Sequence, residues 1–180
     1  MKAKERKDII QYIVQQLIEP QGASLGKVKM QKAVYFLQEG LGIPLGYDFV
    51  MHYYGPYASE LDDILTEMRS EGRLSMTLHI YPTCFGYDIS LGENPQGGSI
   101  PAELKDKVDR LAAFFKKCGA QDMELYATIH FVQAILGERS RPSDVEDVIN
   151  EVVKLKPKFD KDTIRKRHSE LVTEGLLNPV

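Results

Sequence analysis

The segment LDDILTEMRSEGRLSMTLHIYPTCFGYDISL, residues 61–91, decides the fold, because its hydrophobic periodicity changes partway along. Up to Gly72 its apolar side chains have helical spacing, at Leu61, Ile64, Leu65 and Met68. From residue 73 onward apolar residues alternate in two arms, at Leu74, Met76, Leu78 and Ile80 and then at Phe85, Tyr87, Ile89 and Leu91. This alternation predicts a two-stranded hairpin, joined near Pro82–Cys84, with one side on the core.

The residues before this segment predict two helices and a strand. Apolar residues recur at helical spacing over residues 8–19, and a second buried stripe, ended by Gly40, consists of Met30, Ala33, Val34 and Leu37. The run VMHYY, residues 50–54, is β-branched and aromatic and stops at Gly55-Pro56, which predicts a strand. The order helix, helix, strand, helix, hairpin is close to that of a winged helix, although the strand comes after the second helix.

The remaining sequence predicts a linker and then helices. The stretch GENPQGGS, residues 92–99, has no periodicity, whereas residues 101–117, 122–136, 143–155 and 160–174 have helical patterns. We therefore predict an α+β, helix-dominant fold. Its parts are a winged-helix-like N-terminal half with a small β-hairpin (residues 1–91), a linker (residues 92–100) and a C-terminal helical cap (residues 101–180), packed as one compact unit.

Composition narrows the class of protein. A chain of 180 residues suits one domain, and 23 basic against 26 acidic residues exclude a general nucleic-acid coat. Cys84 and Cys118 stand far apart and suggest no disulfide framework, which favours a reduced cytoplasm. Since no window offers about 18 consecutive apolar residues, no membrane span is expected.

No motif for catalysis, a metal or a cofactor is present in the sequence. The four histidines fall in four different predicted elements, outside any zinc-binding spacing. Nucleophile-elbow, P-loop and dinucleotide-binding glycine patterns are also missing. We therefore predict a protein that is not an enzyme and that needs no metal or cofactor. An enzyme whose site assembles from scattered His, Asp and Tyr residues is the alternative.

Charge bears on nucleic-acid binding in two places. The helix of the winged-helix order that would enter a DNA groove lies within residues 57–71, where five acidic residues face one basic residue, so phosphates would repel it. The strongest basic stretch lies later, and its candidate nucleic-acid-binding residues are Lys158, Lys161, Arg165, Lys166 and Arg167. This stretch is either a phosphate-binding patch or a solvated helix that pairs with neighbouring acids.

Aromatic residues crowd around Gly55-Pro56. They are Tyr47, Phe49, His52, Tyr53, Tyr54 and Tyr57. Aromatic side chains beside a rigid turn are typical of a protein-binding surface. The equally weighted alternative is that they fill the core between the neighbouring helices.

Two of these segments together carry a family resemblance. The helix KMQKAVYFLQ, residues 29–38, followed by YGPY at residues 54–57, resembles the Panacea domain family of SocA-like antitoxins, and most closely its uncharacterised YwgA-like relatives. Weaker echoes are ELYATIH (residues 124–130) and LKPKF (residues 155–159). Antitoxin members usually carry Trp shortly before the Y-G-P turn, where this chain has His52 and Tyr53. The resemblance implies a cytosolic, non-enzymatic prokaryotic protein that binds another protein, in some members a toxin encoded beside it.

The resemblance also implies a set of partner-binding residues. They are Lys29, Gln31, Lys32 and Tyr35 in the helix, with His52, Tyr54, Gly55, Pro56 and Tyr57 around the turn. We expect Gly55 and Pro56 to set the backbone, and Gln31 to hydrogen-bond the turn. Tyr35 and Tyr54 are expected to contact the partner. A purely structural role for the motif is the alternative.

The predicted function is a non-enzymatic protein-interaction module, an antitoxin or adaptor-like protein of a prokaryotic toxin–antitoxin system. The alternative is a winged-helix-like transcriptional regulator that binds nucleic acid. A homodimer is compatible with either function, because helical periodicity does not distinguish a core face from an interface.

Overall fold

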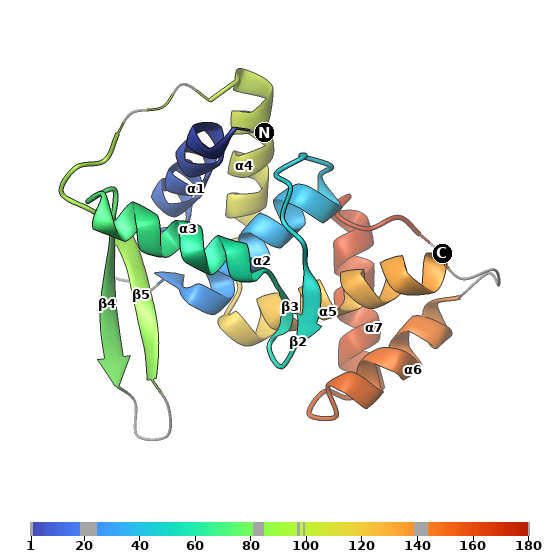
Figure 1. The fold of residues 1–180 in the computed structure, drawn as a ribbon. Coiled ribbons are helices and arrows are strands. Elements are labelled where there is room, and N and C mark those ends of the chain that lie inside the picture. Colours follow the sequence, from blue (N-terminus) through green and yellow to red (C-terminus); the bar gives the residue numbers. More distant parts are fainter. Residues whose placement is uncertain are drawn as a thin grey trace.

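The computed structural model describes residues 2–18, 25–80, 85–96, 98, 100–138 and 144–179. Within these residues helices predominate over two small antiparallel sheets, which confirms the α+β, helix-dominant class. In Figure 1 the wing-like pair β4 and β5 projects from one side, and α6 and α7 lie on the other. In chain order the elements are α1 (Ala3–Leu17), β1 (Leu25–Gly26), α2 (Lys27–Tyr35), the π-helical turn η1 (Phe36–Gly40), β2 (Val50–His52), β3 (Gly55–Tyr57), α3 (Ser59–Ser70), β4 (Leu74–Ile80), β5 (Phe85–Leu91), α4 (Ala102–Phe115), α5 (Ala120–Gly137), α6 (Val145–Leu155) and α7 (Lys161–Thr173).

The first half contains a three-stranded antiparallel sheet in the order β1-β5-β4. With α1, α2 and α3 it has the helix and strand order of a winged helix, and the β2–β3 ribbon is inserted between α2 and α3. The strand β1 pairs with β5 through Leu25↔Ile89 and Gly26↔Asp88. It escapes prediction from sequence because a strand of two residues is too short to show alternation.

The predicted hairpin at residues 74–91 is confirmed, with β4 and β5 paired from Leu74↔Leu91 to Ile80↔Phe85. Only its base covers the core, where Met76 and Ile89 are buried. Toward the far end the same alternation leaves Ile80 and Phe85 exposed, so the expectation that one whole side packs on the core is wrong for that end. The connection predicted near Pro82–Cys84 lies outside the described residues.

The predicted helices form and differ mainly at their ends. α1 begins at Ala3, five residues before the predicted start, and η1 prolongs α2 to Gly40. α6 begins after Asp144, whose carboxylate accepts a hydrogen bond from the Asp147 amide at 2.9 Å. This is an N-cap, which stabilises the first turn of a helix. Ser143, the predicted start, lies outside the described residues.

The two halves share one core, and α5 joins them. Every residue from Met123 to His130 is buried, since α2 and β3 pack on α5 from the first half and α6 and α7 from the second. The predicted linker is tied down as well, because Gln11 Nε2 donates to the Gln96 carbonyl at 2.8 Å. Apolar as α5 is, no helix among the described residues is long and apolar enough to cross a membrane.

Candidate functional site

The aromatic segment around Gly55-Pro56 forms a small hairpin, β2–β3, on the surface. Its strands pair in the register Val50↔Tyr57, Met51↔Pro56 and His52↔Gly55. The prediction that one strand runs to residue 54 is therefore wrong, because Tyr53 and Tyr54 form the turn and Gly55-Pro56 begin the return strand. Gly55 has φ +84°, a left-handed conformation that closes the turn and that other residues avoid. Pro56 is tolerated because a two-stranded ribbon consists only of edge strands.

The turn presents aromatic side chains to solvent. Tyr53 is 77% exposed and Tyr54 51% exposed, and their rings meet edge to face with centroids 4.9 Å apart. His52 is exposed beside them. Tyr47 and Phe49 are buried in the core instead. Part of the aromatic cluster therefore fills the core, and the other part, at the hairpin turn, forms an exposed surface.

Gln31 holds the end of the hairpin, as expected from its place in the motif. Its Oε1 accepts from the Ala58 amide at 3.1 Å, and its Nε2 donates to the Ala58 carbonyl at 3.0 Å. The Nε2 also lies 3.3 Å from Asp62 Oδ1. Because Gln31 is buried and its amide is satisfied on both sides, it anchors the backbone of the hairpin.

Two buried lysines hold the hairpin from beneath. Lys32 Nζ donates to the Pro56 carbonyl at 2.6 Å, and Lys156 Nζ donates to the Tyr53 carbonyl. Burial lowers the pKa of Lys32 to about 7, although Glu124 opposes that shift. The Lys32 amino group is therefore buried and bonded to the hairpin backbone, and its contact with a partner stays a prediction.

Glu124 completes this arrangement and escapes prediction from sequence periodicity. Its side chain is buried, with Oε1 2.6 Å from Lys156 Nζ and Oε2 3.1 Å from Lys158 Nζ. The signal for it in the sequence is one carboxylate within the apolar run of residues 123–129, in the weaker part of the family resemblance. Glu124 on α5 thus holds Lys156, and Lys156 in turn holds the Tyr53 carbonyl of the β2–β3 hairpin. Removing a single partner from such a buried ion pair is strongly destabilising.

Tyr35 is buried and is not a partner contact, which corrects the sequence prediction. It is 1% exposed, and its hydroxyl lies 2.7 Å from His130 Nδ1 in a hydrogen bond between α2 and α5. Burial raises the pKa of Tyr35 and lowers the pKa of His130 to about 4. The pair is therefore neutral at physiological pH and serves the core.

A pocket of about 290 Å³ lies between the start of α2 and the hairpin. It brings together much of the predicted partner-binding set, and its lining consists of Lys27, Val28, Gln31, Lys32, His52, Tyr54, Gly55, Tyr57 and Asp62. Lys29 lines a neighbouring groove, and Tyr35 and Pro56 are buried. Within the predicted partner-binding set, the side chains that are not buried are those of Lys29, His52, Tyr54 and Tyr57.

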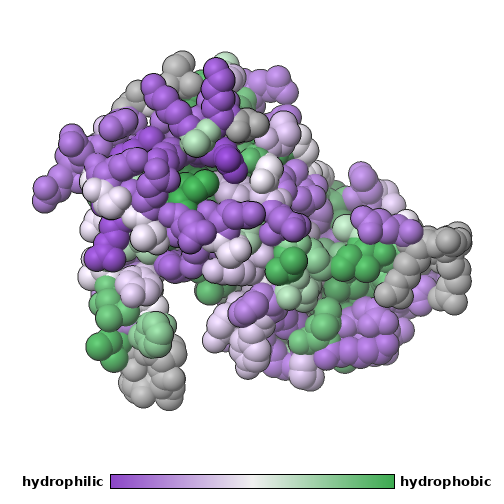
Figure 2. Space-filling model, viewed as in Figure 1, coloured by the Kyte–Doolittle hydropathy of each residue, from purple (hydrophilic) through white to green (hydrophobic). Residues whose placement is uncertain are grey.

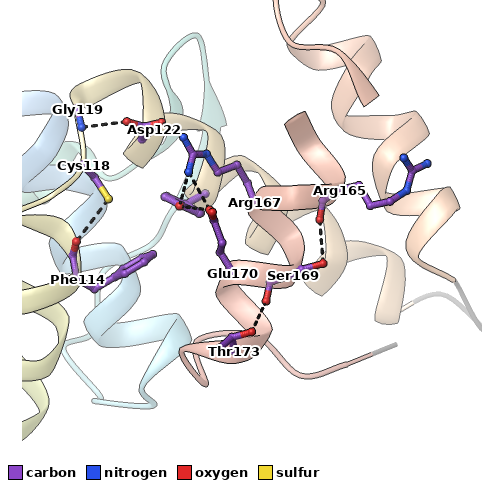
Figure 3. Close-up of polar contacts among 10 residues, drawn as sticks. Phe114, Cys118, Gly119, Asp122, Arg165, Arg167, Ser169, Glu170 and Thr173 are labelled. Carbon is purple, nitrogen blue, oxygen red and sulfur yellow. Dashed lines mark hydrogen bonds and ion pairs between the residues drawn. The ribbon is translucent and has the colours of Figure 1, made fainter. Parts of the chain in front are cut away.

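Arg167, from the predicted basic patch, is part of the structure rather than a free cation. Its guanidinium lies 2.7 Å from Asp122 and 2.8 Å from Glu170, and Figure 3 shows it between these two carboxylates. It also donates to the Tyr126 hydroxyl at 3.1 Å. The hydrogen bond with Glu170 raises the pKa of Arg167 further above its usual range. The contacts join α7 to the start of α5.

Of the other four candidate residues in that stretch, Arg165 and Lys158 are also paired with acids. Arg165 lies 2.7 Å from both Glu146 and Asp162. Lys158 pairs with Glu124, Lys161 Nζ donates to Asn150 Oδ1 at 2.7 Å, and Lys166 is exposed. The interpretation as a solvated helix that pairs with neighbouring acids therefore fits the geometry better than a phosphate-binding patch.

Within the described ranges, no group of three or more His, Cys, Asp or Glu side chains lies close enough to hold a metal ion. Burial raises the pKa of the Cys118 thiol to about 11, so little thiolate forms at neutral pH. Cys84 lies outside the described residues.

The fold and the site define an α+β protein with a winged-helix order and an aromatic hairpin clamped from below. No protein-family model matches the sequence, and a search of curated proteins found no match. The resemblance to the Panacea domain family therefore stays a prediction, carried by residues 29–38 and 54–57.

Proposed function

We propose that this protein is a non-enzymatic protein-interaction module that binds a partner protein through the β2–β3 hairpin and the pocket beside it. The observation that carries the proposal is the exposed aromatic pair, Tyr53 and Tyr54, at the turn of that hairpin. Tyrosine is enriched among the residues that dominate binding energy at protein interfaces. Its large ring contributes contact area with few rotatable bonds, so little conformational entropy is lost on binding.

The buried contacts beneath the hairpin support this function. Gln31, Lys32 and Lys156 hold its backbone at Ala58, Pro56 and Tyr53. They come from α2 and from the residue after α6, so the turn is fixed from two sides. A surface that is ordered before binding avoids the free-energy cost of ordering it in the complex.

The resemblance to SocA-like antitoxins supports a narrower form of the proposal. In this form the protein is a cytoplasmic antitoxin or adaptor-like protein of a prokaryotic toxin–antitoxin system, and its partner is a toxin encoded beside it. Both parts of the motif lie at the proposed site, because the helix motif anchors the hairpin and the Y-G-P-Y motif forms it.

Nucleic-acid binding is the second candidate, because the sheet order β1-β5-β4 and the preceding helices follow the winged-helix order. The helix before the wing is α3, which exposes Glu60, Asp63 and Glu67. Phosphates would be repelled by that surface. Gel retardation of duplex DNA at low salt, lost when Arg165, Lys166 and Arg167 become glutamine, would support this candidate over the first.

The test is to identify the partner and then to measure its binding. The tagged protein is isolated from its native host with nuclease, and a stoichiometric partner is purified and titrated in isolation. We expect Tyr54→Ala to weaken binding about tenfold, which is about 1.4 kcal/mol. The matched control is Ile135→Ala, which changes an exposed apolar residue of α5. Equal affinity of the folded Tyr54→Ala variant and the wild type would refute the assignment of the surface.

A further inference from the structure

The strand β4 is an edge of the three-stranded sheet. The sheet order is β1-β5-β4, so β4 pairs with β5 along one side, and within the described ranges no strand pairs with its other side. In Figure 1 β4 is the outer strand of the projecting hairpin. Among the described residues, this seven-residue strand therefore keeps one backbone edge open.

The hydrogen bonds to β5 show which backbone groups face the open edge. The Gly92 amide donates to the Arg73 carbonyl at 3.0 Å, one step beyond the pair Leu74↔Leu91. Opposite residues of antiparallel strands alternate between hydrogen-bonded and non-hydrogen-bonded pairs. The odd-numbered residues of β4 therefore bond to β5, and the even-numbered residues direct their amides and carbonyls to the open edge. These residues are Leu74, Met76, Leu78 and Ile80.

β4 carries none of the features that keep an edge strand from pairing. Edge strands of monomeric proteins are commonly protected by charged side chains, proline or a bulge. The sequence of β4, LSMTLHI, has no lysine, arginine, aspartate, glutamate or proline, and its register with β5 runs without interruption. Its titratable side chain, His79, lies 2.8 Å from Asp88 of the same hairpin. A second copy of β4 therefore meets no like charge on this strand.

The apolar side of β4 is buried at its base and exposed at its far end. Leu74 and Met76 are 2% and 7% exposed, whereas Leu78 and Ile80, on the same side of the strand, are 48% and 82% exposed. Figure 2 shows hydrophobic side chains on the projecting part of the hairpin, separated by an open gap from the rest of the molecule. Covering these side chains is favourable, so a strand added at this edge gains binding energy from them.

The strand is complementary to itself when it is turned end for end. Antiparallel pairing about Thr77 places Leu78 opposite Met76 of a second copy, and Ile80 opposite Leu74 of a second copy. All four outward-facing residues then exchange backbone hydrogen bonds, and apolar side chains meet on one face of the sheet. On the other face the two Thr77 side chains meet, which is a favourable cross-strand pair. The exposed far end of each copy thus lies beside the buried base of the other.

We propose that two copies of this chain pair through β4, antiparallel and centred on Thr77, so that their three-stranded sheets join into one. This inference goes beyond the proposed function and does not rest on it. The groove next to Tyr54 is lined by residues 85–88 of β5 and by no residue of β4. The dimer therefore presents two copies of the β2–β3 site, one on each side of the shared sheet edge.

The first test measures the oligomeric state of the full-length protein by sedimentation over a range of concentrations. We expect a monomer–dimer equilibrium. Leu78→Ser shortens the side chain only, whereas Leu78→Pro also removes the amide that faces the open edge and leaves the ladder to β5 intact. We expect the dissociation constant of the Leu78→Pro dimer to be at least tenfold higher than that of the Leu78→Ser dimer. Ile135→Ser, which changes an exposed residue of α5, should dimerise as the wild type.

The second test measures the register by disulfide formation in a Cys84→Ser background. Thr77→Cys places two thiols in a non-hydrogen-bonded pair at the centre of the interface, where Cα atoms lie about 4.5 Å apart, within the range of a disulfide. We expect Thr77→Cys to form a covalent dimer on oxidation. The matched control is Ser75→Cys, on the same face of β4, which lies opposite His79 of the second copy and should stay unlinked.

Three outcomes would overturn the proposal. They are a wild-type protein that stays monomeric at every concentration, equal dissociation constants of Leu78→Pro and Leu78→Ser, and cross-linking of Ser75→Cys as readily as of Thr77→Cys. Circular dichroism of each variant shows whether it keeps the wild-type fold, so that a loss of dimer is not mistaken for unfolding.

Discussion

The buried pair of Tyr35 and His130 makes the stability of this protein sensitive to acid. The pKa of His130 is lowered from 6.5 to about 4, because burial disfavours the imidazolium. Between these two values the unfolded chain binds a proton at this residue and the native protein does not. The contribution of the neutral His130 to the free energy of unfolding is therefore complete above pH 6.5 and is lost as the pH falls toward 4.

The magnitude follows from the shift. A pKa difference of one unit is about 1.4 kcal/mol, so a shift from 6.5 to about 4 corresponds to about 3 kcal/mol. This is a large share of the stability of an ordinary domain, about 5–15 kcal/mol. The lost stability concerns the interface between α2 and α5, because Tyr35 lies on α2 and His130 on α5. These two helices also carry Gln31, Lys32 and Glu124, which hold the β2–β3 hairpin.

The assay compares the wild type with His130→Gln, whose amide does not titrate. The chain has no tryptophan, so urea unfolding is followed by far-UV circular dichroism at several pH values from about 7.5 to 4. Titration of carboxylates affects both proteins and cancels in the difference. We expect the advantage of the wild type over the variant to shrink by about 3 kcal/mol across this range. A difference that stays constant with pH would refute the reasoning.

Three further predictions concern the β2–β3 hairpin and the ion pairs of Arg167. Gly55→Ala places a side chain at φ +84° and a Cβ 3.1 Å from a side chain of α5. We therefore expect the free energy of unfolding, measured by urea titration, to fall by about 2 kcal/mol. A change below about 0.5 kcal/mol would contradict the turn geometry. Gln31→Met removes both hydrogen bonds to Ala58 and should lower stability by about 2 kcal/mol and speed exchange of the Ala58 amide proton, measured by NMR; an unchanged exchange rate would show that the clamp is not needed. Arg167→Gln breaks two ion pairs and should lower the melting temperature by an amount equivalent to about 1 kcal/mol. Lys166→Gln, on the exposed face of the same helix, should leave the melting temperature unchanged. Equal effects of the two variants would argue against a structural role for Arg167.

Local pattern was sufficient for the helices and for the long hairpin. The apolar stripes of α3 and the alternation of β4 and β5 each lie within one continuous segment, where the period of side-chain direction is a property of the backbone. The reversal at Gly55 was missed, because a Gly-Pro pair ends a strand or begins the next one depending on the pairing partner. The same limit applies to β1, which exists only because Ile89 is beside it.

The candidate site also combines features set by local sequence with features set by tertiary contacts. The sequence by itself determined the class of fold, the anchor role of Gln31 and an aromatic turn near Gly55. Tertiary structure alone decided that Tyr35 is buried against His130, 95 residues away, while Tyr54 is exposed. It also brought Glu124 and Lys156 under the hairpin, on elements far apart in the chain. Burial and ion pairing depend on which elements meet, and periodicity within one element carries no information about its neighbours.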